Sequence, residues 1–150
     1  MHYQAIGGLN MYAEFTDDLI TGNETIDTQH KELIGKINDL LRSCEEHANK
    51  AGAAKMLNYL ADYTDFHFNA EEALQESIGY PGIEEHKKKH AELRAAVQEL
   101  YDRLTEEEGP TDAFVAMVNE KVTDWLYYHI QTFDRSVAEY KYMNDNTGRI

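Results

Sequence analysis

Seven side chains that can bind a metal fall on the apolar, core-facing stripes of this sequence. Five of them are histidines, out of seven in the chain, and two are acids. His67 and Glu71 are four residues apart, as are His86 and His90, and this spacing places each pair on one face of a helix. The full set is His30, His67, Glu71, His86, His90, His129 and Asp134.

Burying seven ionisable groups is costly unless something compensates for them. A buried carboxylate or imidazole shifts its pKa toward the neutral form and still requires hydrogen-bond partners. A bound cation removes most of this difficulty, because deprotonated imidazoles and carboxylates become its ligands. Each histidine taken alone fits an ordinary, hydrogen-bonded core residue, so the metal hypothesis depends on the set as a whole.

The donor types narrow the choice of metal. Cys44 is the only cysteine, so a structural zinc site made of thiolates is excluded. Seven ligands also exceed what one tetrahedral ion uses. Five imidazoles with two carboxylates suit a pair of borderline ions bridged by the carboxylates. Iron is favoured, with manganese and zinc as alternative occupants.

The breaks in the sequence divide it into four helical segments. Both prolines lie beside glycines, within residues 79–82 and 109–110, and a softer break falls at residues 49–52. Between the breaks, apolar residues recur every three or four positions, and no segment sustains an alternation of period two. The sequence therefore predicts helices and no sheet, with Thr111 as the N-cap of the fourth helix.

Four amphipathic helices with short connections pack most simply as an antiparallel bundle. We predict an all-α fold, an up-down-up-down four-helix bundle over about residues 21–143. An N-terminal arm over about residues 1–20 precedes it, and residues 1–150 form one domain. All four helices contribute metal-binding side chains at matching depths, and this joint arrangement is what indicates a metal site.

Composition excludes several partners. Twenty-eight acidic residues against 14 basic ones give a formal net charge of −14, which disfavours nucleic acids and anionic membrane surfaces. No apolar run is long enough to span a bilayer, and the N-terminus lacks the basic and apolar parts of a signal peptide. A single cysteine suits a reducing compartment. We expect a soluble, cytoplasmic protein with no nucleic-acid or membrane partner.

The order of the motifs resembles the hemerythrin family, especially its bacterial branch. The pattern is one histidine, then HxxxE, HxxxH and HxxxxD, with a tyrosine–proline step between the second and third motifs. It extends over about residues 17–142. Each motif alone is weak, but the full set is highly specific and identifies the chain as a single hemerythrin-like domain.

The resemblance implies a non-haem di-iron centre, bridged by an oxo or hydroxo group, that binds O2 reversibly. It assigns His86, His90 and His129 to one iron, His30 and His67 to the other, and Glu71 and Asp134 to both as bridges. The iron with two histidines keeps an open position for O2. Leu126 matches the position whose apolar side chain covers the O2 pocket. NO and azide are further small ligands of such a centre.

Three positions depart from regular helical spacing or from the family pattern. Asp134 follows His129 by five residues, about 140° around a regular helix, so a local π-bulge is needed to bring both side chains to one face. Phe15 stands where many bacterial members carry tryptophan, a change expected to affect packing. Gln75 stands where methionine is common. It would tune the pocket if it faced inward, but we expect it to face solvent.

Three functions are consistent with these residues. We favour reversible O2 binding, for carriage, storage or delivery, over the alternatives. The first alternative is an O2 or redox sensor that signals to a separate, unidentified protein partner. The second is a di-iron oxidase or peroxidase, which needs a substrate pocket and proton donors beside the open position. An apolar lid at Leu126 and histidine-rich ligation favour an O2-binding protein that is not an enzyme.

Overall fold

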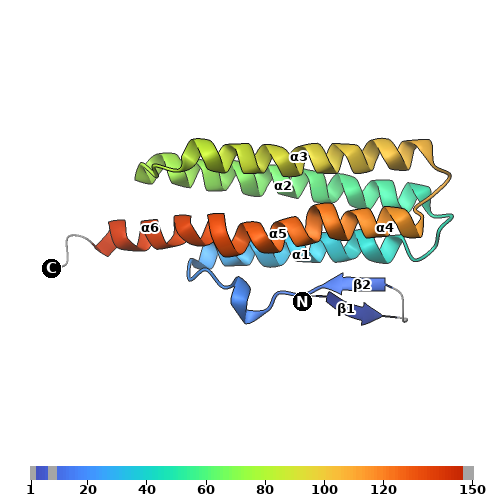
Figure 1. The fold of residues 1–150 in the computed structure, drawn as a ribbon, viewed down its shortest axis with the longest axis horizontal. Helices are drawn as coiled ribbons and strands as arrows, with labels where there is room; N and C mark the ends of the chain where they lie inside the picture. The colour runs from blue at the N-terminus through green and yellow to red at the C-terminus, as the bar shows by residue number, and fades with distance from the viewer. Residues whose placement is uncertain (1–2, 7–9, 147–150) are drawn as a thin grey trace.

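The computed structural model describes residues 3–6 and 10–146, and four long helical rods dominate it (Figure 1). The first three rods are α1 (Glu24–Ser43), α2 (Lys50–Ile78) and α3 (Ile83–Glu106). The fourth is a continuous series of segments: α4 (Asp112–Val118), η2 (Asn119–Thr123), α5 (Asp124–His129), η3 (Ile130–Asp134) and α6 (Arg135–Asn146). The predicted all-α four-helix bundle is thereby confirmed.

Local chemistry defines the helix ends. The side chains of Asn23, Asn49 and Thr111 each accept a hydrogen bond from a backbone N–H in the first turn of the helix that follows. These caps satisfy donors that have no partner within the helix. Gly79 ends α2 with a φ of 65°, in the left-handed region that glycine adopts without penalty. The predicted cap at Thr111 and the break after residue 78 are both present.

The N-terminal arm contains a small sheet that the sequence did not predict. Strands β1 (Tyr3–Ile6) and β2 (Asn10–Ala13) pair antiparallel, and a short 3-10 turn, η1 (Asp17–Leu19), follows. The expectation of no sheet is wrong here, because four-residue strands are too short to show a period of two. The Asn38 side-chain amide bonds both backbone polar groups of Ala13, at 2.8 and 2.9 Å, and so fixes β2 to α1.

The bundle interior has an apolar half and a polar half. Large apolar side chains such as Ile37, Leu57, Leu100 and Phe114 are fully buried where the C-terminal part of α1 meets the N-terminal part of α2. The buried polar residues lie toward the opposite end of the rods. Among the described residues, no helix is both long and apolar enough to cross a membrane.

Candidate metal centre

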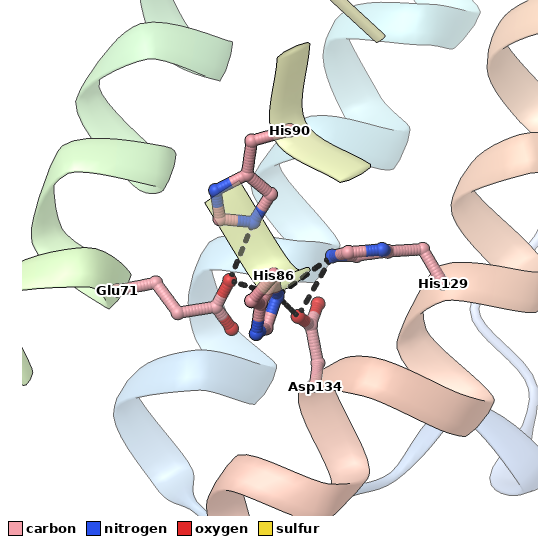
Figure 2. Close-up of side chains that lie close together, drawn as sticks. All are labelled: Glu71, His86, His90, His129 and Asp134. Carbon is pink, nitrogen blue, oxygen red and sulfur yellow. Dashed lines mark hydrogen bonds and ion pairs between the residues drawn. The ribbon is translucent and has the colours of Figure 1, made fainter. Parts of the chain in front are cut away.

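The seven predicted side chains converge in the polar half of the bundle. Each is at most 2 % exposed. Their possible ligand atoms form two groups, within each of which all atoms lie within 4.8 Å of one another. The first group is Glu71, His86, His90, His129 and Asp134, which Figure 2 shows, and the second is His30, His67, Glu71 and Asp134. The two carboxylates belong to both groups.

The imidazole nitrogens of the first group point toward one another. The Nε2 atom of His86 lies 2.9 Å from Nε2 of His129 and 3.0 Å from Oδ1 of Asp134 (Figure 2). On the other side, Nε2 of His90 lies 3.1 Å from Oε1 of Glu71. Two imidazole nitrogens can share only one proton, so lone pairs that converge in this way are better satisfied by a cation than by each other.

A π-helical turn places the last acid of the set. The segment η3 (Ile130–Asp134) is π-helical, as the five-residue spacing between His129 and Asp134 predicts. The wider turn brings both side chains to one face, with Nε2 of His129 3.1 Å from Oδ1 of Asp134. Asp134 also contacts α1, where its Oδ2 atom lies 2.6 Å from Nε2 of His30. It therefore connects the two groups.

Hydrogen bonds on the outer side of two histidines orient their inner nitrogens. Nδ1 of His67 lies 2.7 Å from Oε1 of Gln29, and Nδ1 of His90 lies 2.7 Å from a carboxylate oxygen of Glu72. An oxygen acceptor requires the proton on Nδ1, so the lone pair is on Nε2 and faces the centre. Nε2 of His67 and Oε2 of Glu71 are buried and have no hydrogen-bond partner. These unpartnered donor atoms fit a bound cation.

Gln75 is part of the centre, contrary to our expectation that it would face solvent. Its side chain is fully buried, and its amide lies 2.9 Å from Nδ1 of His86. The physical reason is its spacing, since Gln75 follows Glu71 by four residues and shares its face of α2. When the amide presents Oε1 to His86, it accepts the Nδ1 proton and leaves Nε2 of that histidine with a lone pair. The spacing to Glu71 was visible in the sequence.

Aromatic rings enclose two of the histidines. Phe68 stacks on His90, with ring centroids 3.7 Å apart and an interplanar angle of 3°. Trp125 and Phe133, four residues before and after His129, both stack on its ring at 4.4 and 5.3 Å. Such packing restricts ring rotation and keeps water away from the centre.

Burial and neighbouring charges shift the histidine pKa values in opposite directions. Burial, reinforced by nearby imidazoles, lowers the pKa of His67 to about 3 and that of His90 to about 2. Burial also opposes the charged form of His86. Hydrogen bonds to Asp134 and Glu71 outweigh burial there and raise the pKa to about 9. The metal-free centre therefore holds a proton on one imidazole and excludes protons from two others.

The two carboxylates also differ. Burial, followed by repulsion from Asp134, raises the pKa of Glu71 well above its ordinary value. Burial opposes ionisation of Asp134 too, but His129 and His30 outweigh it and hold the pKa of that carboxyl well below its usual range. A divalent cation between the groups would favour the ionised form of both acids and the unprotonated Nε2 of each imidazole.

The remaining predicted residues are placed as follows. Leu126 is 2 % exposed and lies one helical turn before His129. Phe15 packs against the apolar core from the arm, with the Lys31 ammonium 5.2 Å from its ring. Sequence reasoning missed the outer hydrogen-bond partners Gln29 and Glu72, because nothing in their spacing distinguishes them from other polar residues on exposed helix faces.

Comparison with known proteins gives a consistent result. Residues 21–139 match the family described as the hemerythrin HHE cation binding domain. The chain is 36% identical over 123 residues to the bacteriohemerythrin of Pseudomonas paraeruginosa, and the aligned region covers 82% of this chain and 77% of that protein. A bacteriohemerythrin of Stenotrophomonas maltophilia is 32% identical over the same length.

Solved structures agree with these matches. The crystal structure of a wild-type hemerythrin superimposes with a TM-score of 0.66 at 27% sequence identity, covering 77% of this chain and 85% of that one. A variant with one leucine replaced by alanine gives a TM-score of 0.69 at 26% identity, covering 80% and 88% of the two chains. The similarity extends over the bundle that carries the candidate centre.

Proposed function

Because the chain belongs to the hemerythrin family, we propose that it binds O2 reversibly at a non-haem di-iron centre. In this proposal three histidines would hold one iron, two would hold the other, and the two carboxylates would bind both irons, together with a solvent-derived oxo or hydroxo group. A reduced iron pair supplies the electrons that O2 takes up on binding. The ligand residues are His86, His90 and His129 on one side, His30 and His67 on the other, and Glu71 and Asp134 between them.

One observation carries the proposal. The two groups of ligand atoms share both carboxylates and no histidine. A single ion would use one group and leave the other buried and uncompensated, whereas two bridged ions use both. The unequal division, three imidazoles against two, gives the second ion one protein ligand fewer and therefore an open position for an external ligand. NO and azide fit the same position.

Binding is favoured over catalysis by the surroundings of the centre. Leu126 is buried beside His129, and the aromatic rings around His129 and His90 offer no acid or base. A di-iron oxidase needs an acid or base that transfers protons next to the open position, and none of these side chains is one. Sensing through a protein partner uses the same O2 chemistry and stays the second candidate. The proposal includes a cytoplasmic location, which the free thiol of Cys44 suits.

Metal analysis and absorption spectroscopy test the proposal directly. Protein produced with ample iron should contain about two irons per chain. Exposing the reduced protein to O2 should produce a visible absorption band that disappears under vacuum and returns with O2. One metal per chain, or a band that never forms, would contradict the proposal.

A pair of histidine variants tests the assignment of the open position. His67→Ala removes one of the two imidazoles of the second iron, so O2 binding should be lost while part of the iron is retained. His47→Ala is the matched control, since His47 is exposed and its side chain bonds Asp112 on the surface, outside both groups of ligand atoms. The same O2 spectrum in both variants would show that His67 is not a ligand.

A further inference from the structure

One layer of side chains covers the centre on the side of the apolar core. Neighbouring helices run antiparallel, so one layer contains residues that follow a histidine on two helices and precede a histidine on the other two. On α1 and α3 it contains the residues three positions after His30 and His90. On α2 and α5 it contains the residues three positions before His67 and His129. These positions are Leu33, Thr64, Leu93 and Leu126, each at most 2 % exposed. The layer therefore contains three leucines and one hydroxyl.

The hydroxyl of Thr64 has no partner. Its Oγ1 atom is buried and makes no hydrogen bond. An unsatisfied buried hydroxyl is destabilising relative to a paired one. Thr64 also lies one turn from His67, the histidine whose Nε2 atom is buried without a partner. A buried donor without a partner, one helical turn from a proposed iron ligand, indicates that a molecule bound at the open position accepts its hydrogen bond.

A cavity reaches this hydroxyl from the surface. It has a volume of about 210 Å³, lies between α2 and α3, and is lined by Ala61, Thr64, Asp65, Arg94, Val97 and Gln98. At its rim, Nε of Arg94 donates to Asp65 at 2.8 Å. The Arg94 guanidinium also covers the ring of Phe68, 5.1 Å from its centroid, and that ring stacks on His90. The cavity thus extends from a charged rim to the cover of the centre.

We propose that this cavity is the pocket through which small ligands reach the centre, and that the Thr64 hydroxyl donates a hydrogen bond to the bound ligand. The inference rests on the proposed function and names its ligand class, which is O2 and small anions that accept a hydrogen bond. Thr64 acts as a specificity-determining residue, because the leucines beside it have no donor to offer.

A second cavity provides the comparison. It measures about 170 Å³ and lies between α1, α2 and α6, on the other side of the centre, where Ile26, Ala70, Glu71 and Leu74 contribute to its wall. Ala61 and Ala70 are both partly exposed alanines of α2, and each lines one of the two cavities. Replacing either with leucine fills one cavity and leaves the other intact.

The first experiment measures azide association with the oxidised, iron-loaded protein by stopped-flow absorption. Ala61→Leu should slow association roughly tenfold, because the larger side chain narrows the cavity through which azide would pass. Ala70→Leu should leave the rate unchanged. The reverse result would assign access to the second cavity and overturn the inference, as would equal rates in both variants and the unmodified protein.

The second experiment separates the hydroxyl from its structural role. Thr64→Val replaces an unpaired hydroxyl by a methyl group, so the metal-free protein should melt at the same or a higher temperature. Azide affinity of the iron-loaded protein should nevertheless fall roughly 5- to 10-fold, the effect of one lost hydrogen bond. Thr64→Ser, which keeps the hydroxyl, should retain the affinity. Unchanged affinity in Thr64→Val would overturn the role of the hydroxyl.

A third readout does not depend on iron. Crystals of the metal-free protein pressurised with xenon should show a xenon atom in the cavity between α2 and α3, and Ala61→Leu should remove it. If the unmodified protein binds xenon there but no azide or O2 when loaded with iron, the proposed function fails and the pocket remains. If O2 and azide bind but xenon does not enter, the access route is wrong and the proposed function stands.

Discussion

Gln75 determines which nitrogen of its neighbour is available to a metal. The amide holds Nδ1 of His86 at 2.9 Å, in a position with no solvent to replace it. Without that partner, the Nδ1 proton of His86 is buried and unpaired, and the ring loses its preferred tautomer and orientation. Residues that hydrogen-bond a metal ligand in this way contribute substantially to the affinity of the protein for the metal.

Gln75→Leu should therefore weaken metal retention while the fold persists. The expected loss of affinity is roughly 10- to 100-fold, measured by competition with a chelator of known affinity. Asn58→Leu serves as the control, since Asn58 is exposed on α2 beside the apolar half of the bundle. Equal retention in the two variants would show that the contact between Gln75 and His86 has no role in holding the metal.

Leu126 controls whether water reaches the proposed O2 position. Its side chain is apolar and buried, so it excludes water and offers no proton.

Leu126→Glu would introduce an acid–base group and admit water. Irreversible oxidation of the iron under O2 should then accelerate by an order of magnitude, if the barrier falls by about 1.4 kcal/mol. Leu126→Met, which stays apolar, should resemble the unmodified protein in the same spectroscopic decay. An oxidation rate indifferent to Leu126→Glu would remove Leu126 from the pocket.

At the scale of the elements, the sequence predicts what depends on local spacing. The four helical rods follow from apolar stripes and from breaks at glycine and proline. The π turn η3 follows from the five residues between His129 and Asp134, which no regular helix brings to one face. The burial of Gln75 was predictable from its spacing to Glu71.

Contacts between distant segments were not predictable in the same way. The β2 strand depends on the Asn38 amide, 25 positions away from Ala13. The next residue of the arm, Glu14, donates its backbone N–H to the hydroxyl of Tyr127 at 2.9 Å, 113 positions away. No periodicity encodes such pairs, because they form only after the bundle has assembled. The arm is therefore an element that the bundle defines.

Tyr127→Phe tests how strongly the arm is attached. Removing the hydroxyl leaves the Glu14 N–H without its acceptor, so the free energy of unfolding should fall by about 1 kcal/mol. Tyr128→Phe is the matched control, because Tyr128 is 66% exposed. Denaturation with urea, followed by circular dichroism, measures both. A larger loss in the control would show that the Tyr127 hydroxyl does not hold the arm.

At the scale of the whole molecule, the apolar half of the bundle stabilises a polar half that is unfavourable on its own. Five imidazoles and two carboxylates share a volume from which water is excluded. Any cation that binds the folded chain and not the unfolded one adds to stability by mass action. Removing the metal should therefore lower the melting temperature clearly. Equal melting temperatures of the loaded and metal-free proteins would show that the centre is peripheral to stability.

The metal-free protein should also lose stability in acid. The pKa values of His67 and His90, about 3 and 2, lie below the ordinary value of 6.5. Between pH 6.5 and 3 the unfolded chain binds protons that the folded chain refuses, so the free energy of unfolding falls as the pH falls. The loaded protein should lose stability over the same range, because protons compete with the metal for its imidazoles.

On the alkaline side the two forms should differ. In the metal-free protein the pKa of His86 is about 9, so the folded chain keeps a proton that the unfolded chain releases above pH 6.5. This contribution is complete below pH 6.5 and is lost as the pH rises through 9.

With metal bound, Nε2 of His86 is a ligand and carries no proton, so the loss of stability above pH 6.5 should disappear. Melting curves from pH 6.5 to 9, with and without chelator, measure the difference, which should reach several degrees. His86→Gln should abolish the alkaline loss in the metal-free protein. A melting temperature that stays constant over this range in the unmodified metal-free protein would mean that Asp134 and Glu71 do not hold a proton on His86.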